Sequence, residues 1–436
     1  MGLRIKKSTL FTMLTNICRV VLALVLVASG FVKAVDPKGT MYKMQEYLSA
    51  FTIDNIFSEE WLLLFASILA AVEFLLGLFM LMGVYRKFVS TFVFILFLFF
   101  TLFTSYIAVY DPVSDCGCFG DVWVLSNEQT LLKNLFLLLL ATIVFCGRRR
   151  FIRNVSYRNR WAVVLYSIFY IVFVEGLSLV HVPVIDFRQY KVGNDLRVLT
   201  QSSPDKYKIV SLYERGEEFC YFDEDTVPGN DWVFVEATSV LDVKGEPAVI
   251  DDFSILDWKN DYDVAEDVLS DTGYVCVIVS EAVENASVNR IDRVNDLYDY
   301  CLENGIQFYM ATASDEENME LWQKRTGAEY DLHWADKSML RDMTRANPGL
   351  VLIKDGIIKG KWTASDIPEP ELVFAPISKS GFLAFLDNAL QRWYSWLWLL
   401  AIPLLVLSYF DFLVARIKDY RKAADDNKIK ENSSDI

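Results

Sequence analysis

The chain has 436 residues, of which 53% are hydrophobic, and its formal net charge at pH 7 is −15. A chain of this length has room for about two or three domains. The apolar fraction excludes an ordinary soluble protein, and the lack of a basic patch in the acidic part of the sequence argues against binding of nucleic acid.

Six apolar runs predict six transmembrane helices, because a helix of about 20 residues crosses a hydrocarbon core of roughly 30 Å. The runs lie at 14–34, 61–83, 88–110, 130–146, 161–182 and 394–414. Basic residues precede the first run and small residues follow it, so a cleaved signal peptide is the alternative there. Its length and the early start of the next run favour a retained span. A lipid bilayer is therefore the first expected partner.

Lys and Arg near the ends of these runs predict how the chain crosses the membrane, since positive charge stays in the cytoplasm. Basic residues lie before span one, between spans two and three, after span four and after span six. Both termini are therefore predicted to be cytoplasmic. The loop 35–60, the loop around 114–120 and the segment 183–391 are predicted to face the other side. The last of these is strongly acidic, which we interpret as a solvated surface rather than a cation site.

Ionisable side chains inside a span are costly and mark internal pairs or functional sites. Glu73 is near the middle of span two and Glu175 lies inside span five, whereas Arg19 is at the cytoplasmic end of span one. Lys33 is close to the outer end of span one, and its long side chain can reach inward. A pair between Lys33 and Glu73 is therefore one of two interpretations. The alternative is a protonated Glu73 that is hydrogen-bonded to a neighbouring helix.

The loop between spans three and four contains Ser114-Asp-Cys-Gly-Cys-Phe-Gly120, which has two thiols one residue apart on the predicted oxidising side. Gly117 permits the unusual backbone that a ring between Cys116 and Cys118 requires. A strained or exposed disulfide is labile, so a redox pair is the leading hypothesis. A site for a soft metal such as Cu(I) and a structural turn are the alternatives. We predict no metal ligands.

Two further cysteines lie in the first 150 residues. Cys18 and Cys146 are near the cytoplasmic ends of spans one and four, about a membrane thickness from the loop. They cannot exchange with the loop thiols directly, and we interpret them as packing residues. No sequence feature identifies a cofactor; a quinone in the bundle is the candidate electron acceptor.

The first 150 residues resemble the DoxX-like, MauE-type four-helix membrane proteins, the latter named for methylamine utilisation. The residues that carry the resemblance are Arg19, Ser29-Gly30, Lys33, Asp36-Pro37, Glu73, Gly77, the Cys116-Gly-Cys118-Phe-Gly120 loop and Asn134. The resemblance implies a bundle distantly similar to vitamin K epoxide reductase, with a suggested role in maturing disulfide-containing proteins outside the cytoplasm.

The acidic segment has two parts. Alternating strand-like runs at 207–213, 218–222 and 232–237 predict a small β-rich collar. From about Gly245 the pattern becomes strand 274–280, helix 287–305, strand 306–314 and helix 315–328, which is typical of an α/β sheet. Ser287 is the expected N-cap of the first of these helices, and Gly305 its C-cap.

The end of the second part reads Pro348, an apolar strand, a Lys-Asp-Gly turn and another strand. This resembles the final hairpin of thioredoxin-like domains, where a cis-proline precedes the strand beside the active site. The lead-in at 246–258 is similar to peroxiredoxin-like and TlpA-like members. The resemblance covers about 245–365. It implies that Pro348 lies at a binding surface, and His333 and Trp334 are further candidates for that surface, with packed or surface roles as the alternative.

The α/β part departs from that family where the active-site thiols belong. Thioredoxin-like oxidoreductases have Cys-x-x-Cys at the start of the helix after the first central strand. The corresponding residues here read Ser-Glu-Ala-Val-Glu-Asn-Ala-Ser-Val-Asn-Arg, without cysteine. Cys276 and Cys301 are expected to be buried, and Cys220 has no assigned role. A binding or docking role is therefore favoured over redox activity for this part.

The expected architecture is a four-helix transmembrane bundle (1–150), a fifth span (151–184), a β-rich segment (185–244), an α/β thioredoxin-like domain (245–390), and a sixth span with a cytoplasmic tail (391–436). A fusion of such a bundle to an outward thioredoxin-like domain fits the bacterial inner membrane with a periplasmic soluble domain. The leading function is thiol-disulfide handling or maturation of envelope proteins, with an envelope protein as the client. The alternative is a non-enzymatic scaffold or assembly subunit of a membrane complex.

Overall fold

The computed structural model divides the chain into two compact units. The first combines Met1–Phe187 with Pro376–Ile436, and the second is Arg188–Ala375. The described residues are 7–53, 56–113, 117, 120–123, 125–183, 185–216, 218–223, 226, 229, 231–257, 259–374 and 393–434.

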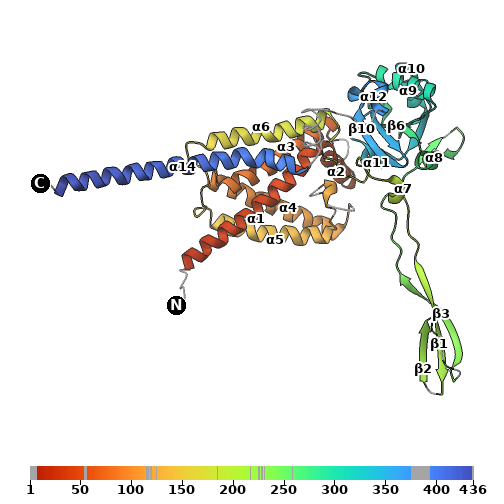
Figure 1. Cartoon of the computed structure of the whole chain (residues 1–436), viewed down its shortest axis with the longest axis horizontal. Helices are drawn as coiled ribbons and strands as arrows, with labels where there is room; N and C mark the ends of the chain where they lie inside the picture. The colour runs from red at the N-terminus through yellow and green to blue at the C-terminus, as the bar shows by residue number, and fades with distance from the viewer. Residues whose placement is uncertain are drawn as a thin grey trace. The chain divides into compact units, whose positions relative to one another are not determined.

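The first unit contains six helices that are long and apolar enough to cross a membrane, as predicted (Figure 1). They are α1 (Lys7–Val35), α3 (Glu59–Met82), α4 (Arg86–Tyr110), α5 (Asn127–Cys146), α6 (Arg160–Val180) and α14 (Trp393–Ser434). Large apolar side chains such as Leu102 and Leu132 point outward, with 65% and 71% of their surface exposed. A helix that is apolar on all sides suits a lipid environment.

The loop predicted at 35–60 contains a further helix, α2 (Pro37–Ala50). Asp36 caps it by accepting a hydrogen bond from the backbone N–H of Gly39 at 2.9 Å, and Pro37 occupies the first turn. Pro is favoured at this position because its missing N–H would be unpaired anyway. Apolar periodicity alone did not predict α2, since polar and apolar residues are mixed along it.

The sixth span packs against the fifth within the first unit. The Tyr170 hydroxyl of α6 donates a hydrogen bond to the Trp396 carbonyl of α14 at 2.9 Å, and Trp396 is buried. Asp411 of α14 accepts hydrogen bonds from the Ser156 N–H and, at 2.9 Å, from the Asn159 side chain. These bonds fix α14 to the connection between α5 and α6.

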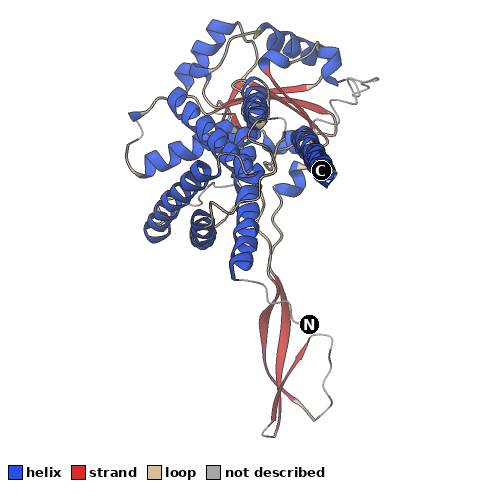
Figure 2. Ribbon diagram, turned by 90° about the vertical axis from the view of Figure 1, so that its left-hand side faces the viewer, coloured by secondary structure: helices blue, strands red, loops and turns tan. Residues whose placement is uncertain are grey.

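The second unit is built on a seven-stranded sheet in the order β10-β9-β6-β7-β8-β4-β5. The strands are β4 (Ile255–Asp257), β5 (Tyr262–Asp263), β6 (Tyr274–Ser280), β7 (Gln307–Thr312), β8 (Leu332–Ala335), β9 (Gly349–Lys354) and β10 (Ile357–Thr363). β6, β7 and β8 are parallel, and β4, β5, β9 and β10 pair antiparallel to their neighbours. The expected α/β sheet is therefore present (Figure 2).

Alternate residues of β6 belong to two different apolar cores, because side chains along a strand point to opposite faces. Cys276 and Ile278 belong to one core, with residues of α9 (Asp292–Asn304) and α10 (Glu316–Thr326). Val275 and Val277 belong to the other, with residues of α7 (Leu196–Leu199), α8 (Ala265–Ser270) and α11 (Lys337–Met343). Short helices η3 (Val283–Asn285), η4 (Ala364–Asp366) and α12 (Pro370–Phe374) complete this part.

The helix predicted at 287–305 is shorter than expected. Ser287 is not its N-cap, because α9 begins only at Asp292. The Ser287 hydroxyl instead accepts a hydrogen bond from the Asn289 N–H at 3.3 Å, a local turn that competes with helix initiation. Gly305 is the C-cap, as predicted, with φ +64°.

The strands of the collar form a separate three-stranded sheet, in the order β2-β1-β3. They are β1 (Lys206–Arg215), β2 (Glu218–Asp223) and β3 (Val233–Val243). All of β3 is exposed to solvent, including Val233 and Phe234. The two chain segments that lead into and out of this sheet are joined where the Ser203 N–H donates to the Glu246 carbonyl at 3.0 Å. We call residues 206–243 the β-arm.

Candidate functional site

Two glycines bring α1 and α3 into close backbone contact. A Cβ atom on Gly30 would lie 2.4 Å from the backbone nitrogen of Phe74, and one on Gly77 would lie 2.7 Å from that of Val27. Small residues let helices approach in membranes, where the hydrophobic effect does not drive them together. The polar side chains one turn away on each helix are thereby forced to meet.

The meeting point is a buried cluster of Ser29, Lys33 and Glu73. The Lys33 ammonium lies 2.8 and 2.6 Å from the two carboxylate oxygens of Glu73 and donates to the Ser29 hydroxyl oxygen at 2.9 Å. The Ser29 hydroxyl donates in turn to Glu73 Oε2 at 2.7 Å. Only 1% of Glu73 and 7% of Lys33 are exposed.

The surroundings of this cluster are apolar and include Ala34, Ala70 and Phe74. Charges in such a setting must be paired, because removing an ion from water costs several kcal/mol. The ammonium has three N–H groups and three acceptor atoms within 2.9 Å. The Lys33 ammonium is thus in direct contact with the Glu73 carboxylate. The alternative, a Glu73 that is hydrogen-bonded to a neighbouring helix without Lys33, is not the arrangement in this structure. The cluster holds one balanced charge pair across α1 and α3.

Asn134 lies in a different polar contact, between α4 and α5. Its side-chain amide donates to the Thr104 hydroxyl at 3.2 Å, and the Thr101 hydroxyl donates to its backbone carbonyl at 3.3 Å. Asn134 is 3% exposed. Among the described residues, no hydrogen bond links this contact to Lys33 or Glu73, so the structure does not gather the predicted polar residues of the bundle into one site.

Arg19 is buried near the connection between α5 and α6. Its guanidinium donates to the Ile152 carbonyl at 2.6 Å and lies 5.3 Å from the centre of the Phe151 ring. Asn16 of the same helix accepts from the Ile152 N–H at 3.1 Å. Arg19 thus fixes a loop to α1. We call the part of the bundle around this connection and the α3–α4 turn the arginine end.

The loop cysteines Cys116 and Cys118 lie outside the described residues. Gly117, between them in sequence, has φ +60°, and a Cβ atom on it would lie 2.6 Å from Cγ of Lys43 in α2. Gly120 begins the short helix η2 (Gly120–Val122), and a Cβ there would lie 3.5 Å from the Val32 side chain. The glycines of this loop therefore contact α2 and the part of α1 next to Lys33.

The described cysteines are all free. Cys18, Cys276 and Cys301 are buried, whereas Cys146 and Cys220 are exposed. The sulfur atoms of Cys276 and Cys301 are 3.8 Å apart, and the pKa of the Cys276 thiol is raised by its hydrogen bond to Cys301 and by burial. Within the described parts of the chain, no group of three or more His, Cys, Asp or Glu side chains could hold a metal ion.

The three candidate residues of the second unit occupy different settings. Pro348 follows a cis peptide bond and is buried beside β9. His333 is also buried, at 6% exposure, and packs edge-on against Tyr309 with the ring centres 5.4 Å apart. Burial lowers the His333 pKa below its ordinary value. His333 therefore does not belong to an exposed surface, contrary to expectation, whereas Trp334 is 41% exposed.

The segment without cysteine after β6 is held by polar contacts. The Ser280 hydroxyl donates to the Asn347 side-chain carbonyl at 2.5 Å, and the Asn347 amide donates to the Ala282 carbonyl at 3.0 Å. Glu281 forms an ion pair with Arg341 at 2.6 Å. These partners lie about 60 residues away in sequence, so periodicity gave no signal for them.

Residues 11–147 match the model of the family described as methylamine utilisation protein MauE. This range contains the cluster of Ser29, Lys33 and Glu73, as well as Asn134 and the Cys-Gly-Cys loop. The apolar helical bundle of this part of the chain is thus consistent with a MauE membrane domain. A search of curated proteins finds no match to the chain.

Proposed function

We propose that the protein handles thiols and disulfides in proteins of the bacterial envelope, with Cys116 and Cys118 as the exchanging pair. The observation that carries the proposal is the backbone of Gly117, which has a φ of +60°. Gly117 stands between the two cysteines in the sequence, in a loop of the bundle that matches MauE. Glycine tolerates this conformation without cost, and a reactive Cys-x-Cys pair needs a tight turn.

Lys43 supports this proposal through its contact with Gly117. A lysine near a thiol favours the thiolate, which is the form that attacks a disulfide. The Lys43 ammonium also lies 2.6 Å from Glu46, so its positive charge is shared with a carboxylate. In this proposal, the Glu46 carboxylate would offset part of the effect of Lys43 on a loop thiol.

The proposed exchange is balanced as follows. A client thiolate attacks one sulfur of the loop disulfide, breaks the S–S bond and forms a mixed disulfide. A second client thiolate then displaces the loop sulfur, so the client gains a disulfide and the loop takes up two electrons and two protons. Re-oxidation of the loop needs an acceptor of two electrons and two protons, and a membrane quinone belongs to the chemical class that meets this need.

In this proposal, Lys33, Glu73 and Ser29 position the bundle end that supports the loop. Gly120 contacts Val32, the neighbour of Lys33, so the buried pair fixes the helix against which the loop rests. Asn134 and Arg19 hold other helix contacts. They are therefore proposed as positioning residues rather than groups that touch a client.

The second unit is proposed to dock the client and to be a thioredoxin-like domain that lacks active-site thiols. The strand order of its sheet and the place of Pro348 directly before β9 support this assignment. Pro348 and the half-exposed Trp334 would line the docking surface. Buried His333 would act only by supporting Trp334 from the adjacent position.

The proposed location is the bacterial inner membrane, with both termini in the cytoplasm and the second unit in the periplasm. Arg86, Arg148, Arg149 and Arg153 support this orientation, because positive charge near span ends favours the cytoplasmic side. The loop thiols would then face the oxidising compartment.

The test is to trap the redox state of Cys116 and Cys118 in cells by alkylation before and after reduction, and to identify the labelled peptides by mass spectrometry. We expect a reducible disulfide, and we expect replacement of both residues by Ser to lower the yield of client disulfides. Cys146→Ser is the matched control, since Cys146 lies at the end of α5 beyond the loop. Permanently free thiols together with unchanged client disulfides would falsify the proposal.

A non-enzymatic scaffold is the second candidate, favoured by the β-arm. The β-arm exposes Tyr207, Phe219, Tyr221 and Val233, each by more than 60% of its surface. Exposed apolar residues at this density are typical of a surface that binds protein. The arm would then recruit a partner protein, and the cysteine loop would be structural.

Removal of the β-arm distinguishes the two functions. The arm ends meet at its base, where the Gly245 N–H donates to Asp205 at 2.6 Å, so a short Gly-Ser link in place of 206–243 should preserve the remaining fold. The scaffold hypothesis predicts loss of a co-purifying partner with unchanged client disulfides. Retention of every partner would reject it.

A further inference from the structure

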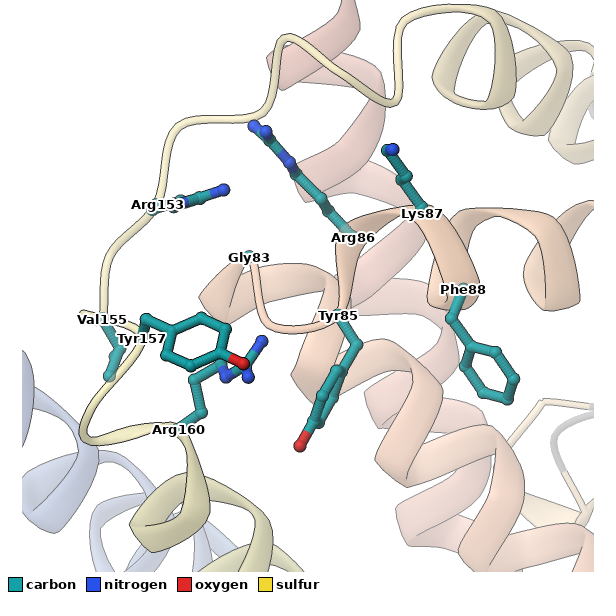
Figure 3. A pocket seen from close by; sticks show the side chains of 9 residues that line it. All are labelled: Gly83, Tyr85, Arg86, Lys87, Phe88, Arg153, Val155, Tyr157 and Arg160. Atoms are coloured by element: carbon teal, nitrogen blue, oxygen red, sulfur yellow. The ribbon is translucent and has the colours of Figure 1, made fainter.

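A pocket of about 390 Å³ lies at the arginine end of the bundle (Figure 3). It is formed by the α3–α4 turn with the first residues of α4, by the connection between α5 and α6, and by the first residue of α6. Four cationic residues line it, namely Arg86, Lys87, Arg153 and Arg160, and no acidic residue does. The lining therefore carries a concentrated positive charge.

Two of the four cations, Arg86 and Arg160, are oriented by contacts that supply no full negative charge. Arg86 donates to the carbonyls of Arg149 and Phe151 at 3.0 and 3.4 Å, which orients its guanidinium but supplies no negative charge. The Arg160 guanidinium lies over the Tyr157 ring at 3.5 Å and the Tyr85 ring at 4.6 Å. Across the described residues, no ion pair involves any of the four.

Asp411 is an acidic residue that contacts the connection between α5 and α6. Its two carboxylate oxygens are engaged by the Ser156 N–H and by the Asn159 amide, so it fastens the connecting loop rather than pairing with a cation. Like charges confined to one pocket repel one another, and a bound anion removes that cost.

Two helix N-termini add to the positive field. α4 starts at Arg86 after Tyr85, and α6 starts at Arg160 after Asn159; neither start has a side chain that accepts from the first-turn N–H groups. Such N–H groups and the helix dipole favour an anion. The four cations and both helix starts thus favour the same kind of ligand.

The place of the pocket, at the start of two apolar spans, favours an anion that also carries apolar chains. The aromatic residues around the pocket are exposed, with Phe88 at 61% and Trp161 at 64%. Aromatic side chains of this kind gather at the boundary between headgroups and acyl chains. A ligand with a phosphate at this depth and apolar chains beside Phe88 fits both features.

We propose that this pocket binds the phosphodiester headgroup of an anionic phospholipid. Arg153 and Arg160 contact the phosphate, Arg86 and Lys87 complete the positive field, and Tyr85 and Tyr157 flank the headgroup. The bound lipid holds the α3–α4 turn to the connection before α6. This assignment does not depend on the proposed redox function. The pocket lies at the start of α4 and beyond the end of α5, whereas the cysteine loop joins the other ends of these two helices.

The test uses the full chain, purified in mild detergent and stripped of lipid, in native mass spectrometry. The purified chain is titrated with phosphatidylglycerol, with phosphatidylcholine as the zwitterionic comparator and with inorganic phosphate as the free anion. The pocket variant is Arg153→Gln with Arg160→Gln. The matched control is Arg149→Gln with Arg158→Gln, which removes the same charge from exposed positions outside the lining.

We expect phosphatidylglycerol to bind in preference to phosphatidylcholine and the pocket variant to weaken that binding about thirtyfold, since each surface cation contributes about 1 kcal/mol toward an anionic lipid. The control variant should retain wild-type binding. Equal losses in both variants would mean bulk attraction and overturn the proposal, as would unchanged binding in the pocket variant. Tighter binding of inorganic phosphate than of the lipid would overturn the lipid assignment. Thermal unfolding of each variant verifies that it folds.

Discussion

Lys33 and Glu73 of the membrane bundle are 7% and 1% exposed and lie 2.6 Å apart. In the second unit, the ion pair of Lys324 and Glu320 has side chains that are 70% and 59% exposed. The first pair joins two helices in an apolar setting, and the second lies in solvent on one helix. We therefore expect ion pairs of the same two residue types to contribute very differently to stability in the two regions.

The surrounding medium explains the difference. Water drives apolar residues together in the second unit, where two cores flank the sheet, so its surface pairs add little. Lipid supplies no such force between helices, and close glycine contacts and paired polar groups hold α1 to α3 instead. Four predictions challenge this comparison, from the largest expected effect to the smallest.

The first prediction concerns access to thiols in the interior of the second unit. Cys276 and Cys301 are fully buried and Cys220 is exposed. A soluble alkylating reagent should label Cys220 at least about a thousandfold faster, because the buried thiols become accessible only by opening events that cost several kcal/mol. Peptide mass spectrometry over a labelling time course measures the three rates. Similar rates for all three would show that this interior is open.

The second prediction concerns Lys33→Met. Removal of the ammonium leaves Glu73 buried without its cation, so we expect a loss of about 3–5 kcal/mol in the free energy of unfolding. Denaturant titration in mild detergent measures it.

Two companion variants test the cause of that loss. Adding Glu73→Leu should recover much of the stability, since no buried charge remains. Lys324→Met should change stability by less than about 1 kcal/mol. Unaltered stability in Lys33→Met would remove the pair from consideration.

The third prediction concerns the glycine contact. Gly30→Ala would place a methyl group against the backbone of Phe74, and we expect a cost of about 1–3 kcal/mol from overpacking. Gly176→Ala is the matched control, because a Cβ there meets nothing within 4 Å. Thermal unfolding in detergent compares the two. A cost shared by both variants would point to helix propensity or lipid contact rather than the α1–α3 interface.

The fourth prediction concerns pH. The folded-state pKa of His333 is lowered by burial, despite the opposing effects of Asp257 and Asp331, whereas the unfolded value is about 6.5. Below pH 6.5 the unfolded chain binds the proton more readily, so stability should fall as the pH drops toward the folded pKa. His333→Gln should reduce this slope in denaturant titrations between about pH 7 and 5. An identical slope in wild type and variant would contradict the prediction.

Much of the fold follows directly from local sequence. The strand predicted at 274–280 coincides with β6, the helix ends at Gly305 as expected, and the six apolar runs correspond to six helices. Apolar periodicity and positive-φ glycines act over a few residues, so they are readable without tertiary information. α2 and the start of α9 were less predictable: α2 depends on a cap from Asp36 at the end of an apolar span, and Ser287 forms a local turn instead of capping α9.

The sequence by itself determined that Lys33 and Glu73 needed compensation, because charges within apolar spans are too costly to leave alone. Only the tertiary structure decided how they were compensated: Gly30 and Gly77 set the distance between α1 and α3, and Ser29 joined the pair. The same holds for His333, whose burial depends on the distant Tyr309, and for the arginine pocket, whose cations come from three separate segments. The free-energy cost of a buried charge follows from the residue and its place in the span. The partner that offsets this cost depends on which helices pack together.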